Sequence, residues 1–222
     1  MAASQESHVA LLVAKETALL LRRCQSHDRP RAVLLAGQPG AGKTELSTML
    51  ISQLDCDAAF INGDDYRRYH PNYRALYAEH GSDCAQFTQS FSSAVTERLI
   101  GTLSDHRLNL VIEGTGRTTD VPRATAELLT AKGYAVEMAV IAARPEVSLT
   151  STLLRFYRMN EGGTIPRATA VEAHDKVVAA LPDNLDALLA LPCIQRIRIW
   201  DRELSRLFDS DVDPDRPSAV LR

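Results

Sequence analysis

Residues 37–44 have the types and the spacing of a phosphate-binding loop. They are Gly37, Gln38, Pro39, Gly40, Ala41, Gly42, Lys43 and Thr44, and they satisfy the pattern G-x-x-x-x-G-K-[ST]. Such a backbone curls so that its N–H groups point at an anion, and a following helix adds positive potential. We expect these residues to bind ATP, with Lys43 reaching the β- and γ-phosphates and the Thr44 hydroxyl coordinating Mg²⁺. A glycine-rich turn without nucleotide is the alternative.

A phosphate-binding loop alone does not distinguish a kinase from a GTPase, a motor or an ATPase switch. A GTPase would need an Asn-Lys-x-Asp signature for guanine, and the chain contains no such tetrapeptide. The residues at the ends of other strands therefore have to decide the chemistry.

A pair of carboxylates follows the second apolar run, at residues 58–62. In an open parallel sheet the ligand lies beyond the carboxyl ends of the strands, so Asp64 and Asp65 are candidates for the site. Phosphoryl transfer needs a carboxylate that orients the acceptor hydroxyl and takes its proton. We predict that Asp64 is this base and lies near the metal, whereas a turn or helix cap is favoured for Asp65.

Two further segments are candidates for binding the acceptor and the transferred phosphate. Residues 113–118 follow the third apolar run and contain Glu113, Thr115 and Arg117, separated by two glycines, as an acceptor-binding loop would. Arg155 ends a helical pattern, and Arg167 follows a flexible stretch, so both could close over the γ-phosphate as a lid. The alternatives are a surface turn and solvated arginines.

Short apolar runs alternate with helical patterns along the chain, which is typical of crossover connections and a parallel sheet. The expected strands are residues 32–36, 58–62, 108–112, 136–142 and 194–200. The expected helices are residues 43–54, 83–103, 121–132, 145–157 and 167–181. We predict an α/β fold of the P-loop NTPase type, with an open parallel sheet of about five strands and helices on both faces.

The chain divides into three expected parts. Residues 1–30 form a helical segment, with a helix at 8–23 that serves either docking or packing; residues 31–208 form the P-loop kinase domain. Residues 209–222 contain four Asp and two Pro, so we expect a loosely ordered tail.

The composition favours a cytoplasmic protein without nucleic-acid or membrane partners. The formal net charge is −3, the pI is about 6.1 and no basic block stands out. The four cysteines form no C-x-x-C pair, and no apolar run is long enough to span a bilayer.

Together, the motifs resemble the zeta toxin family, the toxin kinases of bacterial toxin–antitoxin systems that phosphorylate UDP-N-acetylglucosamine. The similarity covers roughly residues 32–208, and its longer motifs are specific. Besides the loop at 37–44 they are residues 63–67, 70–73, 113–118, 120–122, 151–155 and 167–169.

The resemblance implies roles for individual residues. It makes Asp64 the base that faces the sugar 3′-hydroxyl, with Lys43, Arg155 and Arg167 around the transferring phosphoryl group. The residues that it places at or near the UDP-sugar are Glu113, Thr115, Arg117, Thr125, Arg67 and His70. It also implies a small helical antitoxin partner, which would place a helix where the ATP phosphates bind.

The chain departs from the family pattern near the expected sugar site. Asn62 replaces a common acid, Gly116 replaces a larger apolar residue, and His80 stands where a substrate-binding Tyr is expected. These changes could widen the pocket, so a kinase for another UDP-sugar, a nucleotide or an antibiotic is a second hypothesis. A nucleotide-dependent switch without turnover is the third.

Overall fold

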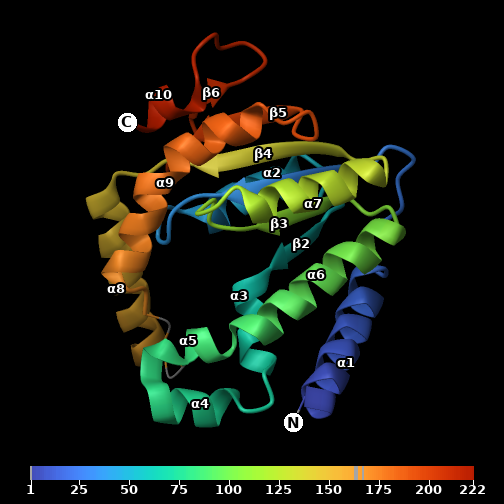
Figure 1. Cartoon of the computed structure of the whole chain (residues 1–222), viewed down its shortest axis with the longest axis vertical. Helices are drawn as coiled ribbons and strands as arrows, with labels where there is room; N and C mark the ends of the chain where they lie inside the picture. Colours follow the sequence, from blue (N-terminus) through green and yellow to red (C-terminus); the bar gives the residue numbers. More distant parts are fainter. Residues whose placement is uncertain (1, 163–164, 167) are drawn as a thin grey trace.

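A mostly parallel sheet forms the middle of the computed structural model, which describes residues 2–162, 165, 166 and 168–222 (Figure 1). The six strands have the order β2-β3-β1-β4-β5-β6. They are β1 (Arg31–Ala36), β2 (Ala59–Asn62), β3 (Leu110–Glu113), β4 (Ala135–Ile141), β5 (Arg196–Trp200) and β6 (Arg206–Asp209). The first five pair in parallel, which confirms the predicted α/β fold.

Strand β6 was not expected, and it pairs with β5 in the antiparallel direction. Only Phe208 and Asp209 of its four residues are buried, so the strand has no apolar run that could reveal it in the sequence. Asp209 accepts hydrogen bonds from two guanidinium nitrogens of Arg196, Nε at 2.7 Å and Nη2 at 2.6 Å. This contact holds the edge strand against the parallel sheet.

Helices cover both faces of the sheet. They are α1 (Ala2–Leu20), α2 (Lys43–Ser52), α3 (Gly63–Tyr66), α4 (Tyr73–His80), α5 (Cys84–Phe87), α6 (Gln89–Asp105), α7 (Asp120–Ala131), α8 (Pro145–Glu161), α9 (Val171–Leu189) and α10 (Pro217–Leu221). Leu46 and Leu50 of α2 join a core cluster with Val33 and Leu35 on one face. The larger cluster on the other face takes side chains from α1, α6, α7 and α9.

Several helix boundaries differ from the sequence prediction. The expected helix at 83–103 is divided into α5 and α6, because Thr88 between them takes a conformation with φ −101° and ψ 0°. Helix α9 continues past the expected end to Leu189, with Pro182 inside it. Within the described part of the chain, no helix is long and apolar enough to cross a membrane.

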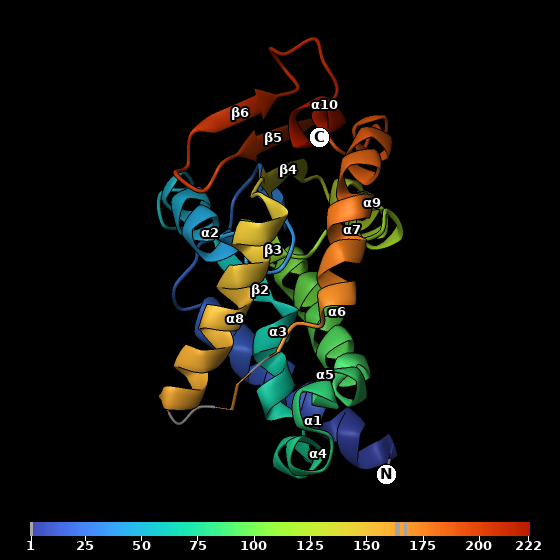
Figure 2. The same ribbon diagram turned by 90° about the vertical axis from the view of Figure 1, so that its left-hand side faces the viewer.

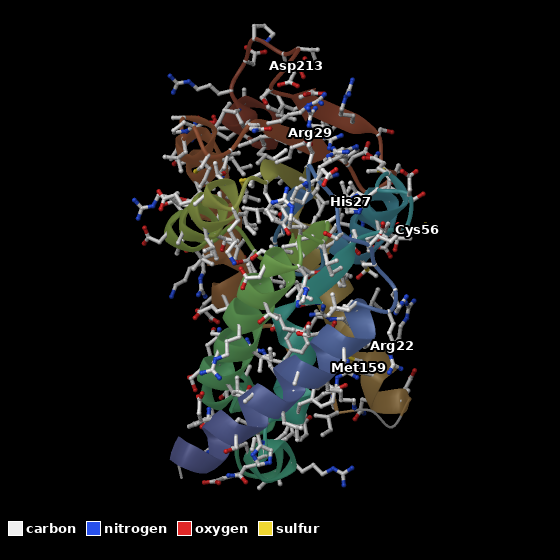
Figure 3. The ribbon with its side chains drawn as sticks, turned by 90° about the vertical axis from the view of Figure 1, so that its right-hand side faces the viewer. Arg22, His27, Arg29, Cys56, Met159 and Asp213 are labelled. Atoms are coloured by element: carbon white, nitrogen blue, oxygen red, sulfur yellow. The ribbon has the colours of Figure 1, made fainter. Side chains whose placement is uncertain are left out.

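The N-terminal helix packs on the domain. Val9, Leu12 and Val13 of α1 are buried in the larger core cluster, and α1 lies along α6 (Figure 3). Apolar residues spaced three and four apart bury one face of the helix, as an amphipathic helix requires. Packing on α6 is therefore one role of this segment.

The last residues are held more firmly than the expected loose tail. They form α10, in which both the N–H and the hydroxyl of Ser218 donate to the Asp186 carboxylate, at 3.0 and 2.7 Å. Pro217 and Ser218 are buried against α9. The Pro that suggested irregular structure instead begins a short helix, where its missing N–H has no cost.

Candidate functional site

The phosphate-binding loop connects the buried strand β1 to the start of α2 at Lys43. Gly40 and Gly42 have φ values of +77° and +109°, which residues with a side chain rarely adopt. A Cβ on Gly40 would also lie 2.0 Å from the Ser148 carbonyl oxygen. The loop can therefore follow this path, tight against α8, only with glycine at these positions.

Lys43 folds back over the loop. Its Nζ donates to the carbonyl oxygens of Gly37 and Gln38, at 2.8 and 3.2 Å. Burial lowers the pKa of Lys43 because it penalises the charged form, and Arg155 acts in the same direction, while Glu113 and Asp64 oppose the shift. A cation in this position would gain from the arrival of an anionic phosphate.

The carboxyl ends of β2 and β3 bring two acidic segments together. Asn62 lies opposite Glu113 in the parallel register, and its side chain accepts a hydrogen bond from the Asp64 N–H at 3.1 Å. Asp64 is the second residue of the short helix α3; its side chain is 57% exposed and accepts a hydrogen bond from Arg67 Nε at 2.7 Å. Asp64 and Glu113 therefore both lie at the carboxyl ends of the parallel strands, where a ligand of such a sheet binds.

A cleft of about 390 Å³ opens at the carboxyl ends of the strands. The predicted site residues that line it come from five separate segments, and they are Pro39, Lys43, Asp64, Arg67, Glu113, Thr115, Thr125 and Arg155. The phosphate-binding loop, the proposed base and the acceptor loop thus share one cavity. Arg155 reaches across to Thr169, with Nη2 3.4 Å from its Oγ1. The predicted lid residue Arg167 lies outside the described residues.

Three predicted substrate residues are not among the described residues around the cleft. His70 packs edge-on against Phe91, with the ring centroids 5.3 Å apart, and burial lowers its pKa. His80 stacks on Phe87 at 4.0 Å. Arg117 is exposed at the end of the acceptor loop. Both histidines lie against apolar rings, which a motif cannot reveal because the partners come from α5 and α6.

Gly116 lines the cleft, but its missing side chain does not account for a wider pocket. Its φ is +73°, and a Cβ there would lie 2.5 Å from Leu181 Cδ1 and 3.2 Å from Ala36 Cβ. A side chain at this position would therefore meet α9 and β1. The glycine is required by the close packing of the acceptor loop on these two elements.

The cleft also contains polar residues that sequence reasoning missed. They are Gln89, Ser92, Ser93, Thr96 and Glu97 from α6, and Thr169 from the segment before α9. Ser92 donates its hydroxyl to the Gly63 carbonyl at 2.6 Å, which connects α6 to the turn that carries Asp64. A helical pattern does not show which of its polar residues face a ligand, so the sequence contained no signal for the α6 residues, whereas Thr169 lies in the motif at 167–169 without having been assigned to the site.

The loop and the cleft fit a nucleoside triphosphate with its metal. Thr44 is exposed in the first turn of α2, and its hydroxyl, like the Asp64 carboxylate, is a hard oxygen ligand of the kind that Mg²⁺ prefers. Among the described residues no group of three His, Cys, Asp or Glu side chains could hold a metal ion. Mg²⁺ commonly takes few protein ligands and completes its shell with phosphate oxygens and water.

At the amino ends of the strands, polar contacts connect the segments that lead into them. His27 Nε2 lies 3.1 Å from Asp57 Oδ2 and 3.1 Å from Asn109 Nδ2, in the connections that precede β1, β2 and β3 (Figure 3). Asn109 Oδ1 also accepts from the Arg31 N–H at 2.8 Å. These bonds align the amino ends of the three strands, whereas the cleft lies at their carboxyl ends.

Comparisons with known proteins identify relatives of this chain. The toxin PezT of Streptococcus pneumoniae is 40% identical over 213 residues, which cover 95% of this chain and 83% of PezT. The toxin zeta of Streptococcus pyogenes is 38% identical over 196 residues, which cover 88% of this chain and 68% of that toxin.

The solved structures agree with the fold. A chain solved for the PezAT chromosomal toxin–antitoxin system of Streptococcus pneumoniae superimposes with a TM-score of 0.86 and 36% identity, covering 97% of this chain and 85% of that one. A chain of the AvrRxo1-ORF1:AvrRxo1-ORF2 complex shares the fold alone, with a TM-score of 0.65 and 17% identity over 90% of this chain and 65% of that one. Since the family model described as Zeta toxin also matches residues 16–213, this chain belongs to the zeta toxin family.

Proposed function

We propose that this protein is a toxin kinase that transfers the γ-phosphate of ATP to the sugar 3′-hydroxyl of UDP-N-acetylglucosamine. The observation that carries the proposal is the single cleft that joins the phosphate-binding loop, Asp64, Arg155 and the acceptor loop from Glu113. A kinase needs these parts within reach of one another, whereas a nucleotide switch needs only the loop.

In this proposal the chain holds the phosphates and moves one proton. The loop N–H groups and Lys43 bind the phosphates, and Arg155 stabilises the charge that develops during transfer. Asp64 accepts the proton of the acceptor hydroxyl, with its carboxylate oriented by Arg67. Bound Mg²⁺, held by Thr44 and Asp64, would neutralise charge on the phosphates.

The acceptor side of the cleft supports a sugar nucleotide. Glu113, Thr115 and Thr125 line it together with polar side chains of α6, and carboxylates and hydroxyls are suited to hydrogen bonds with sugar hydroxyls. The apolar residues Val121, Pro122 and Ile100 lie beside them. A mixed lining of this kind fits a ring with polar edges.

The direct test incubates the protein with Mg-ATP and a panel of UDP-sugars, nucleotides and aminoglycosides, and then looks by mass spectrometry for one added phosphate. We expect UDP-N-acetylglucosamine to gain a phosphate at its 3′-hydroxyl. Phosphorylation of another acceptor would contradict the substrate assignment but support a kinase. ATP binding without any phosphorylated acceptor would contradict the enzyme itself.

A matched pair of carboxylate variants tests the base. Asp64→Asn should abolish product while Mg-ATP still binds, because the amide cannot accept the proton. Asp65→Asn changes the neighbouring carboxylate, which pairs with Arg68 at 3.6 Å on the surface, and should leave turnover near that of the wild type. Loss of ATP affinity in Asp64→Asn would instead assign this residue mainly to the metal.

The partner that we propose is a small helical antitoxin, supported by relatives that are named toxins and by the structural match from the PezAT system. We propose that its helix covers the face with Lys43 and Arg155 and blocks the phosphates. Expression of the wild type in a bacterial host should arrest growth, and Asp64→Asn should not. A cognate small helical antitoxin should relieve the arrest and compete with Mg-ATP. Simultaneous binding of both would contradict this mode of inhibition.

A further inference from the structure

Three buried polar side chains connect the phosphate-binding loop to α8 and α9. Gln38, Ser148 and His174 are 4%, 0% and 0% exposed. Gln38 Nε2 donates to the Ala143 carbonyl at 2.6 Å and to Ser148 Oγ at 3.4 Å. Ser148 Oγ in turn lies 2.8 Å from His174 Nε2. We call these three residues the relay. Removing the Ser148 hydroxyl would leave the buried His174 Nε2 without this hydrogen bond, and removing the imidazole would leave the hydroxyl with the Pro145 carbonyl as its acceptor.

Hydrogen-bond chemistry gives the relay a direction. His174 Nδ1 lies 2.9 Å from Asp175 Oδ1, and a carboxylate can only accept, so the proton of a neutral imidazole belongs on Nδ1. His174 Nε2 then accepts from the Ser148 hydroxyl, and the Ser148 oxygen accepts from Gln38. The Pro145 carbonyl, 3.0 Å from the hydroxyl, is a second and longer acceptor. The imidazole therefore orients the hydroxyl toward α9.

The relay ends at the backbone that holds Lys43. The Gln38 carbonyl oxygen accepts from Lys43 Nζ at 3.2 Å, while the Gln38 side chain is fixed to α8. Ser148 also contacts the loop through its backbone, because a Cβ on Gly40 would lie 2.0 Å from the Ser148 carbonyl oxygen. The position of Ser148 thus affects both the loop and its lysine.

The relay also connects the loop to Arg155. Ser148 and Arg155 lie seven residues apart on α8, which is about two helical turns and places them on the same side. His174 lies in the first turn of α9, which runs beside α8 (Figure 2). One imidazole therefore joins the loop, the helix with Arg155 and the helix that follows the segment with Thr169.

We propose that His174 is a positioning residue, which acts through Ser148 and Gln38 to hold the phosphate-binding loop in the conformation that binds ATP. The inference rests on the proposed function, since it requires ATP at this loop. Neither Ser148 nor His174 is among the described residues that line the cleft, so the effect would be exerted through the loop.

The test measures the dissociation constant of Mg-ATP by isothermal titration calorimetry. Ser148→Ala and His174→Leu should each raise it about 3- to 10-fold, the range expected for the loss of one buried hydrogen bond. His174→Gln keeps an amide that can accept from the Ser148 hydroxyl, and it should restore most of the affinity. The double variant Ser148→Ala/His174→Leu should bind Mg-ATP no more weakly than the weaker-binding single variant, because the two substitutions remove the same hydrogen bond.

Ser104→Ala is the matched control. Ser104 is a buried serine on α6 that donates to the Gly101 carbonyl at 2.8 Å, far along the chain from the loop. It should lose stability without losing ATP affinity. If His174→Leu does not fold, Ser148→Ala still decides the question. Unchanged affinity in folded variants would overturn the relay alone, whereas a wild type that binds no ATP would overturn the proposed function as well.

Discussion

Arg67 holds the carboxylate of Asp64 in place, with Nε 2.7 Å from Oδ1. The remaining guanidinium nitrogens are fixed by other elements, since Nη1 donates to the Ala85 carbonyl at 2.7 Å and Nη2 to Gln89 Oε1 at 2.6 Å. The Arg67 side chain is only 14% exposed, although Asp64 itself is 57% exposed. Helices α5 and α6 thus orient the proposed base through one arginine.

We therefore predict that Arg67→Ala lowers kcat about 10- to 100-fold, which corresponds to the 1.5–3 kcal/mol of a hydrogen bond to a charged group. The dissociation constant of Mg-ATP should change little, because Arg67 lies on the acceptor side of the cleft. Steady-state kinetics and calorimetry measure the two quantities separately.

Arg68→Ala provides the comparison for this prediction. Arg68 pairs with Asp65 at 3.6 Å and its side chain is 63% exposed, so its removal should cost little. An equal loss of kcat in both variants would mean that Arg67 has no special role in orienting Asp64.

Lys43→Met should make the ATP-free protein more stable at pH 7. The lowered pKa of Lys43 means that, between this pKa and the usual 10.5, the unfolded chain binds more protons than the folded one. The free energy of unfolding of the wild type therefore rises with pH across that window. The advantage of Lys43→Met should shrink as the pH approaches 10.5, and urea denaturation at several pH values measures it.

The same variant should lose the stabilisation that Mg-ATP gives the wild type, since binding to the folded state alone raises stability. Lys176→Met, at an exposed position on α9, should show neither effect. A Lys43→Met protein that is less stable than the wild type at pH 7 would show that the bonds to Gly37 and Gln38 outweigh the burial of the charge.

Strand ends and loop patterns were predictable from the sequence because each depends on a few consecutive residues. The sheet and the loop at 37–44 follow from apolar runs and glycine spacing, and the structure confirms the fold. The meeting of Asp64 and Glu113 in one cleft follows from the parallel order of the strands, whereas Arg155 enters the cleft from α8. Their catalytic roles remain predictions.

Contacts between distant helices were not predictable in this way. Gln89 and Glu97 face the cleft only because α6 packs across the end of β2, and the pairing of Ser148 with His174 depends on how α8 meets α9. No local pattern distinguishes such residues from solvated ones on a helix. The antiparallel β6 was missed for a related reason, because half of its residues are exposed.

Gly40→Ala should destabilise the loop and abolish ATP binding. The added Cβ would lie 2.0 Å from the Ser148 carbonyl oxygen in a conformation with φ +77°, so both the loop and α8 would have to move. We expect a loss of about 1–3 kcal/mol in the free energy of unfolding, the usual cost of such strain. Thermal and urea denaturation measure this loss.

Gly101→Ala is the contrasting change at a glycine. Gly101 lies inside α6, where a Cβ would meet no atom within 4 Å. The substitution should stabilise the protein by about 0.5–1 kcal/mol, as expected for alanine in a helix, and leave ATP affinity unchanged. Similar losses of stability at both positions would indicate that the contact with Ser148 is unimportant.

Asp209 should make the stability of the sheet edge depend on pH. The hydrogen bonds from Arg196 lower the pKa of this fully buried carboxyl below its usual 3.8, with burial opposing them and the Asp211 N–H and Arg206 assisting. A lowered folded-state pKa gives stability that is present above pH 3.8 and is lost as the pH falls through the lowered value. Asp209→Asn should therefore cost about 3 kcal/mol at pH 7, because it leaves Arg196 without its main partner.

Urea denaturation of Asp209→Asn and wild type at pH 7 and at pH 3 measures this dependence. The difference between the two proteins should narrow at the lower pH, because the Asp209 carboxyl of the unfolded wild-type chain, with its usual pKa of 3.8, binds a proton there before the folded one does. Asp211→Asn is the matched control, because Asp211 also contacts Arg196 Nε at 3.1 Å but its side chain is 52% exposed. It should cost less than about 1 kcal/mol. If the loss in free energy of unfolding for Asp209→Asn is the same at both pH values, Asp209 acts through the packing of β6 on β5 and its charge contributes nothing.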